Sequence, residues 1–198
     1  AMDCVRVNDS SCVAVIGGKG ISVVKDIELS DKLLDTADYK LAKKDKLLCL
    51  LGHNRAATFG KVIKENAHPF QYKHITMVHN GTLENRWRLP QYWNYDTDSE
   101  ALAHCIADHG IETTWGVIEG AATLVWWDAT EQTLNVLSNG KRPFYMQPLK
   151  DSNGLVWSSE RWTLLTAALR AGITFDKPEK IYCPIMDKLY SFKWNVNT

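Results

Sequence analysis

Four polar stretches of this sequence interrupt apolar ones, and they carry residue types that bind small molecules. They are GHNRAATFG at residues 52–60, NAHPF at 66–70, HNGTLEN at 79–85 and TDSE at 97–100. The planar guanidinium of Arg55 can bind a carboxylate through two parallel hydrogen bonds. Asp98 can bind an ammonium group, or it can cap a helix that starts there. Together these types favour a pocket for a small anionic or zwitterionic ligand.

The pair Asn80-Gly81 follows the β-like run at residues 75–78, with His79 between them. An isolated Asn-Gly pair is most often a turn, because both residues tolerate positive φ. His68 is equally ambiguous, since it can be a core histidine that closes the turn before Pro69. The chemistry of these residues therefore depends on which elements position them.

The expected elements begin with strands, place two helices in the middle, and end with a meander of strands and a closing helix, which is an α+β layout. Strands are expected at residues 12–16 and 21–25 as a hairpin, and then at 46–53, 75–79, 121–128, 133–138, 144–149 and 154–159. Helices are expected at 31–46 with a polar break near residues 38–39, at 98–106, at 114–119 and at 160–171, followed by a hairpin at 180–194. We expect Gly52 to end its buried strand and Ser99 or Asp98 to cap the helix at 98. Two packed sheets with helices outside them satisfy this order.

Composition narrows the class of protein. The chain has 198 residues, 45% of them hydrophobic, and its 23 Lys and Arg balance its 23 Asp and Glu. This predicts one globular domain over residues 1–198, with no charge that favours nucleic acid or an anionic membrane. Five cysteines without C-x-x-C spacing argue against a disulfide framework and a zinc site, and favour a reducing cytoplasm. Ala1 before Met2 is expected to be a tag remnant.

In this order and spacing, the polar stretches resemble the glutaminase domain of class II glutamine amidotransferases, a family of amino-terminal-nucleophile (Ntn) hydrolases. The family's G-H-T-R-W-A-T-H-G segment is similar to GHNRAATFG, its N-A-H-P recurs unchanged, and its H-N-G-x-x-x-N matches residues 79–85. TDSE resembles its S-D-T-E helix start, and DSSCVAV, GAATLVWWD and VWSSE resemble further segments. The resemblance implies a four-layer αββα sandwich of two antiparallel sheets, with no cofactor and no metal.

The resemblance also implies roles for individual residues. Asn80 and Gly81 would form the oxyanion hole, with Gly needed because a Cβ would crowd the approaching tetrahedral carbon. Arg55 would bind the carboxylate of glutamine and Asp98 its ammonium group. Thr58 and His68 fall on the family's pocket positions as well.

The start of the chain departs from the family pattern. Family members begin with a nucleophilic cysteine whose own α-amine acts as the base. Here the opening strand and the helix after it are largely absent, and Cys4 can serve only if everything before it is removed. One hypothesis is a glutaminase with Cys4 as nucleophile, and the other is a degenerate member that keeps the pocket as a binding or regulatory module. Ala56 and Phe59 also replace the family's Trp and His beside Arg55.

The partners expected from the resemblance follow from ammonia chemistry. The family passes ammonia to an acceptor unit that shields it from water. No second catalytic domain is recognisable after the glutaminase-like segments. We therefore expect a small-molecule substrate, glutamine or a related amide, and three alternatives stay open: pairing with a separate acceptor enzyme, outright hydrolysis of an amide, or no chemistry. The sequence does not specify an oligomeric state.

Overall fold

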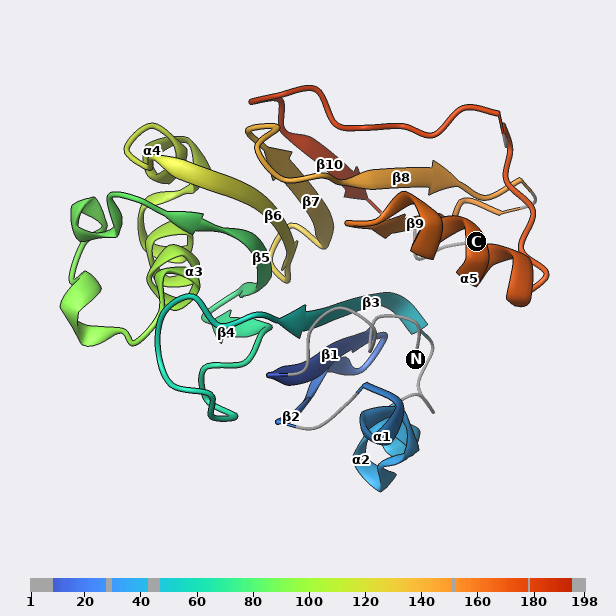
Figure 1. The fold of residues 1–198 in the computed structure, drawn as a ribbon, viewed down its shortest axis with the longest axis horizontal. Helices are drawn as coiled ribbons and strands as arrows, with labels where there is room; N and C mark the ends of the chain where they lie inside the picture. The colour runs from blue at the N-terminus through green and yellow to red at the C-terminus, as the bar shows by residue number, and fades with distance from the viewer. Residues whose placement is uncertain (1–8, 28–29, 43–46, 151, 178, 194–198) are drawn as a thin grey trace.

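The computed structural model describes residues 9–27, 30–42, 47–150, 152–177 and 179–193. Their strands are β1 (Ser10–Gly17), β2 (Gly20–Asp26), β3 (Leu47–Arg55), β4 (Phe70–Tyr72), β5 (Ile75–Leu83), β6 (Gly120–Asp128), β7 (Thr133–Ser138), β8 (Tyr145–Pro148), β9 (Leu155–Ser158) and β10 (Tyr190–Lys193). Their helices are α1 (Ser30–Asp35), α2 (Ala37–Ala42), α3 (Asp98–His109), α4 (Ile111–Trp115) and α5 (Arg161–Arg170), with short 3₁₀ turns η2 (Arg86–Arg88) and η3 (Tyr92–Asn94). Figure 1 shows their arrangement.

The first sheet has the antiparallel order β2-β1-β3. The expected hairpin of β1 and β2 is confirmed. The prediction that Gly52 ends its strand is wrong, because β3 continues in register with β1 until Arg55 lies opposite Ser10. The two faces of the strand are buried to different degrees: Cys49 and Leu51 are buried, whereas Leu48 and Leu50 on the other face are half-buried. The extra residues carry Arg55 into the interior.

Helices α1 and α2 cover the outer face of this sheet (Figure 1). Leu33 packs there against Val13 and Val15. The expected helical segment is divided at Thr36 rather than near residues 38–39. The Thr36 hydroxyl donates to the Leu33 carbonyl at 2.7 Å and accepts the Tyr39 N–H at 3.2 Å, so one side chain ends α1 and starts α2.

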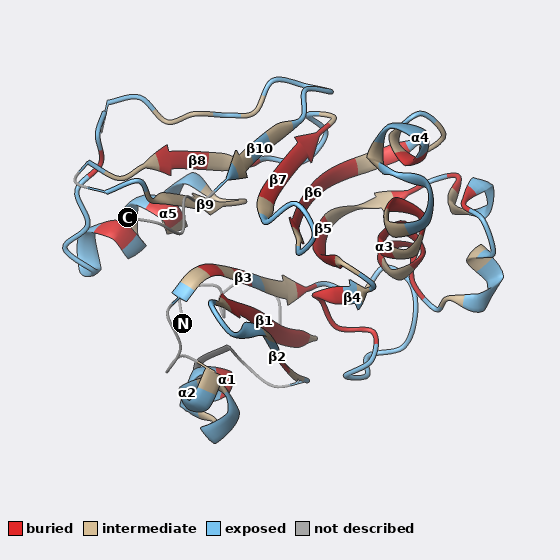
Figure 2. Ribbon diagram, turned by 180° about the vertical axis from the view of Figure 1, so that it is seen from behind, coloured by how far each residue is buried: buried red, intermediate tan, exposed pale blue. Residues whose placement is uncertain are grey.

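The second sheet has the antiparallel order β10-β7-β6-β5-β4. Its strand β5 continues through Asn80-Gly81 to Leu83 and pairs with β6 along its whole length. The turn interpretation of Asn80-Gly81 is therefore wrong. Figure 2 shows that β5, β6 and β7 are largely buried, as expected of strands covered on both faces.

Helices α3 and α4 cover the outer face of the second sheet. Helix α3 starts at Asp98, but its cap is Thr97, whose hydroxyl accepts the Glu100 N–H at 3.1 Å. The expectation that Asp98 or Ser99 caps the helix is wrong, which leaves the Asp98 carboxylate for another partner. The helix expected at 114–119 is also wrong beyond Trp115, where α4 ends.

Strands β8 and β9 form a small antiparallel sheet on which α5 packs. The hairpin expected at 180–194 is wrong in its described part. Tyr182 makes an isolated bridge to Met146, whereas β10 pairs with β7. Residue 194 lies outside the described residues.

The core between the two large sheets completes the layers. It includes Ala14, Ile16, Leu51, Val78, Val125 and Val136. The order helix, sheet, sheet, helix confirms the predicted αββα sandwich of class α+β. No helix in the described part of the chain is both long enough and apolar enough to span a bilayer.

Candidate active site

A cavity of about 1320 Å³ opens between the two sheets. It is bordered by β1, β3 and β5, by the start of α3, and by β9 and α5. Its lining includes every described residue that the sequence assigned to a pocket: Arg55, Thr58, His68, Asn80, Gly81 and Asp98. Cys4 lies outside the described residues. Residues from four separate polar stretches therefore meet at one cavity.

Arg55 is the last residue of β3 and its side chain is buried. Its guanidinium donates to the carbonyl oxygens of Phe59 and Lys61, the second at 3.1 Å. Burial lowers the pKa of Arg55, and the carboxylates of Asp9 and Asp98 oppose that shift. A guanidinium has five N–H donors, so the two bonds leave donors for a ligand.

Asp98 is buried at the first turn of α3 and joins this helix to the second sheet. One carboxylate oxygen, Oδ2, accepts the backbone N–H of Leu83 at 2.8 Å. The Ser99 hydroxyl approaches the other oxygen, Oδ1, at 3.4 Å. A carboxylate offers about four acceptor positions, so Asp98 keeps acceptor capacity facing the cavity.

The backbone N–H of Gly81 points away from its partner strand. Ala122 lies opposite Gly81, and both its backbone groups bond to Asn139 on the β7 side. Directly opposed antiparallel residues exchange both hydrogen bonds or neither. The Gly81 N–H must therefore face the other edge of β5, where β4 pairs only with residues 75–77. The Leu83 N–H on that same edge is the one that Asp98 accepts.

The Asn80 side chain completes this corner. Side chains alternate along a strand, and Val78 belongs to the core between the sheets, so Asn80 also faces inward. Its amide has no hydrogen-bond partner among the described residues and lies on the cavity wall. The corner thus presents one side-chain amide and one backbone N–H to the same space.

Gly81 is required for a reason different from the one expected. A Cβ on Gly81 would lie 1.9 Å from the Ala121 carbonyl oxygen and 2.5 Å from Nε2 of His79. The clash is with the neighbouring strand and not with the space that a ligand would enter. Glycine therefore permits the close approach of β5 to β6.

Three histidines lie beside Arg55, with His68 and His79 buried and His53 half-buried. The rings of His53 and His68 lie 4.0 Å apart, and His68 meets Phe70 edge-on at 5.0 Å. His79 points toward α3, where its Nδ1 lies 3.0 Å from the Ser99 hydroxyl. Burial lowers the pKa of His53 to about 4, lowers that of His68 well below its ordinary value, and lowers that of His79. All three are neutral at pH 7, and no residue hydrogen-bonds to either His68 nitrogen in the described part of the chain.

Smaller contacts fix the loop that follows β3. The Thr82 hydroxyl donates to that of Thr58 at 3.3 Å. Asp9 accepts the Ala57 N–H at 2.8 Å, and the Asn66 amide donates to the Lys61 carbonyl at 3.1 Å. The sequence analysis gave no role to Asp9 or Asn66, although both lie within the motifs on which the family resemblance rests.

The described cysteines offer no reactive thiol at this site. Cys12 and Cys49 are buried, and burial raises the pKa of each to about 12. Cys12 is a core residue, 3% exposed, and its thiol donates to the His53 carbonyl at 3.1 Å. Cys105 is buried against Thr114, and Cys183 is exposed away from the cavity lining. Among the residues that the structure describes, no cluster of His, Cys, Asp or Glu could hold a metal ion.

The fold is an αββα sandwich of the Ntn type with a polar cavity between its sheets. Comparison with known families agrees: residues 53–166 match the family model of a glutamine amidotransferase domain. The chain belongs to the class II glutamine amidotransferase family.

Curated relatives extend this comparison. The chain is 37% identical over 108 residues to a glutamine–fructose-6-phosphate aminotransferase of Buchnera aphidicola, covering 50% of this chain and 17% of that protein. It is 29% identical over 152 residues to the enzyme of the same name from Bacillus subtilis, covering 68% of this chain and 25% of that protein. The chain thus spans a quarter or less of the length of these two relatives.

Two solved structures share the fold over nearly the whole chain. One is described as the allosteric regulatory enzyme of purine biosynthesis, with a TM-score of 0.69, 22% identity, and coverage of 98% of this chain and 44% of that one. The other is the glutamine phosphoribosylpyrophosphate amidotransferase from B. subtilis, with a TM-score of 0.68, 22% identity, and coverage of 99% and 46%. They support the sandwich architecture.

Proposed function

We propose that this domain hydrolyses the side-chain amide of glutamine and releases ammonia. The observation that carries the proposal is the meeting of Arg55, Asp98 and the Asn80-Gly81 corner at one cavity. A zwitterionic amino acid with a terminal amide needs a cation, an anion and oxyanion donors at separate points. These residues supply all three from different elements.

In the proposed reaction Cys4 is the nucleophile. Its thiolate attacks the amide carbon, and the carbonyl π electrons move onto oxygen. The Asn80 amide and the Gly81 N–H donate hydrogen bonds to this oxyanion. The free α-amine of Cys4, whose ordinary pKa is about 7.7 to 8, takes the thiol proton and returns it to the leaving nitrogen as ammonia departs. Water then cleaves the thioester to give glutamate and restores the thiol.

Arg55 and Asp98 fix the substrate in this proposal. Arg55 would bind the α-carboxylate through its remaining donors, and Asp98 would accept from the α-ammonium. Thr58 and His68 would form part of the pocket wall. The neutral His68 ring would shape the wall without adding a second cation beside Arg55.

The proposal includes an ammonia acceptor and a cellular compartment. The released ammonia would pass to a separate acceptor enzyme. The four described cysteines are all free, which supports a reducing compartment such as the cytoplasm.

The second candidate function is a glutamine-binding or regulatory module without catalysis. One observation favours it: no described thiol can act at the cavity, so catalysis depends entirely on Cys4. The substrate contacts at Arg55 and Asp98 do not require that cysteine.

A pair of proteins tests the two candidates. One is the chain prepared to begin at Cys4, and the other is the same chain with Cys4→Ala. We expect the first to release ammonia and glutamate from L-glutamine in equal amounts, and the second to bind glutamine without releasing either. Binding by both proteins with release by neither would favour the module. Absence of glutamine binding in calorimetry on both would reject both candidates.

A further inference from the structure

The loop of residues 56–61 forms one wall of the cavity and is held firmly on its inner side. Ala56, Thr58 and Phe59 line the cavity. Arg55 bonds the carbonyls of Phe59 and Lys61. Gly60 is packed so tightly that a Cβ would lie 3.0 Å from the Asp96 carbonyl oxygen. The backbone of this loop is therefore fixed by the base of the pocket.

The outer side of the same loop is held by a cation on an aromatic ring. The Cζ atom of Arg86 lies 3.9 Å from the centroid of the Phe59 ring and 6.0 Å from that of Tyr92. No carboxylate pairs with Arg86 within the described ranges. A guanidinium over an aromatic face is attracted by the ring's quadrupole. The ring is 36% exposed, and Arg86 packs on its face.

Arg86 is itself rigidly placed, because the residue before it anchors the backbone. The buried Asn85 amide donates to the Val117 carbonyl at 2.9 Å and accepts the Glu119 N–H at 2.7 Å. Arg86 follows directly and begins η2. Its position is thus tied to the end of β5, the strand that carries Asn80 and Gly81.

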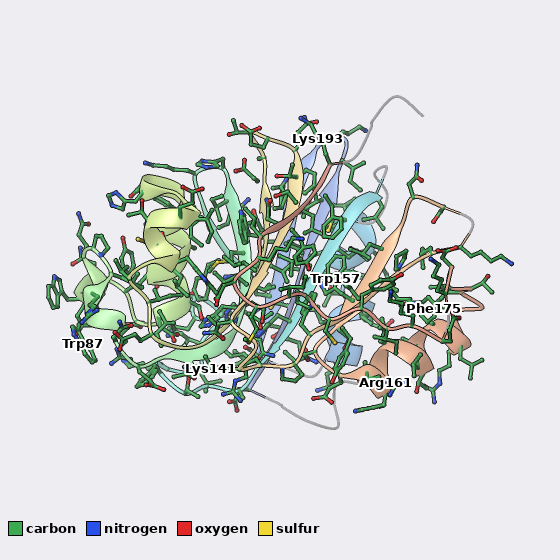
Figure 3. All side chains as sticks on the ribbon, turned by 90° about the horizontal axis from the view of Figure 1, so that it is seen from above. Trp87, Lys141, Trp157, Arg161, Phe175 and Lys193 are labelled. Atoms are coloured by element: carbon green, nitrogen blue, oxygen red, sulfur yellow. The ribbon has the colours of Figure 1, made fainter. Side chains whose placement is uncertain are left out.

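The two residues after Arg86 point elsewhere. Trp87 projects to solvent at the edge of the molecule, as Figure 3 shows, and is 59% exposed. Arg88 lies 3.3 Å from the Glu119 carboxylate. Of the two neighbouring arginines, Arg86 alone contacts the loop, which makes Arg88 a matched control.

We propose that Arg86 and Phe59 form a latch that holds the 56–61 loop closed over the pocket. Arg86 is then a positioning residue: it acts on the substrate through Phe59 and the loop. Phe59 is one of the positions where this chain departs from the family's residue, so the latch is a property of this sequence. Its effect on glutamine rests on the proposed function, whereas its effect on the loop does not.

Hydrogen exchange tests the latch without any substrate. An exposed cation–π contact contributes about 0.5 to 1 kcal/mol, so breaking it should raise the amide exchange rates of residues 56–61 about two- to fivefold. We expect this rise in Arg86→Gln and in Phe59→Leu, and no further rise in the double variant. Phe59→Trp, which keeps an aromatic face, should exchange at the wild-type rate. Arg88→Gln should also match the wild type.

Glutamine titration gives the second readout. Arg86→Gln should weaken glutamine binding by the same two- to fivefold, while the rate at saturating glutamine changes by less than twofold. The thermal midpoint should match that of Arg88→Gln, which separates loop positioning from general destabilisation. If the wild type binds no glutamine but the exchange pattern holds, the proposed function fails and the latch stands. Unchanged exchange in Arg86→Gln, additive effects in the double variant, or an equal rise in Arg88→Gln would overturn the latch.

Discussion

Asp98→Asn separates the charge of this side chain from its structural bond. Asn keeps a side-chain oxygen that can accept the Leu83 N–H, now bonded to Asp98 at 2.8 Å. The helix cap is not affected, because Thr97 provides it. The substitution therefore removes one negative charge from the cavity wall and leaves the fold in place.

The size of the effect follows from the lost contact. A hydrogen bond between charged groups contributes about 1.5 to 3 kcal/mol, which corresponds to roughly 10- to 150-fold in affinity. We expect Asp98→Asn to weaken glutamine binding within this range and to shift the thermal midpoint by less than about 4 °C, as little stability is lost. Calorimetric titration of the non-hydrolysing Cys4→Ala chain measures the affinity directly.

Asp96→Asn is the control for this experiment. Asp96 lies two residues earlier and is exposed, and its carboxylate accepts a long 3.4 Å contact from the Asn66 amide. It carries the same charge outside the cavity lining, so its removal should change the affinity by less than twofold. Equal weakening in both variants would mean that the effect is one of net charge. No weakening in Asp98→Asn would refute the assignment of the ammonium to Asp98.

Three further predictions follow from the site. Asn80→Ala should lower the turnover number of the chain beginning at Cys4 by about 100- to 1,000-fold with little change in KM, and a loss below tenfold in steady-state kinetics would contradict the oxyanion role. Gly81→Ala should cost at least 1 to 3 kcal/mol of unfolding free energy in urea, roughly the cost of overpacking, whereas Gly18→Ala, where a Cβ meets nothing within 4 Å, should not. The free energy of unfolding should fall as the pH drops from about 6.5 toward 4, because the histidines of the unfolded chain bind protons that the folded His53, His68 and His79 exclude. His53 alone should contribute roughly 3 kcal/mol to this loss. A free energy of unfolding that does not change over this pH range would show that these rings are not held neutral.

Much of the fold could be predicted from local patterns. The hairpin of β1 and β2 has two apolar runs joined by a glycine turn, and α5 ends near Gly172, which adopts positive φ. These signals lie in residues that are close together in the chain. Two of the errors occurred where a distant strand decides the conformation. Gly52 and Asn80-Gly81 read as breaks, yet pairing with β1 and β6 keeps both segments extended.

The candidate site also combines features that the sequence predicted with contacts that only the fold reveals. Residue types and motif order identified Arg55, Asn80, Gly81 and Asp98, and the structure brings them to one cavity. The sequence could not reveal that Thr97 caps the helix while the Asp98 carboxylate accepts the Leu83 N–H, since Thr and Asp are both good capping residues. Nor could it reveal the contact of Arg86 with Phe59, because these residues are distant in the chain and meet only after folding.

The central claim is that one amino acid binds with its three polar groups at three separate points of this cavity. The most direct test is a crystal structure of the Cys4→Ala chain with bound L-glutamine. We expect the α-carboxylate at Arg55, the ammonium at Asp98, and the amide oxygen about 3 Å from both the Asn80 amide nitrogen and the Gly81 nitrogen. Glutamine bound outside the cavity, or with its amide oxygen turned away from Gly81, would contradict the account.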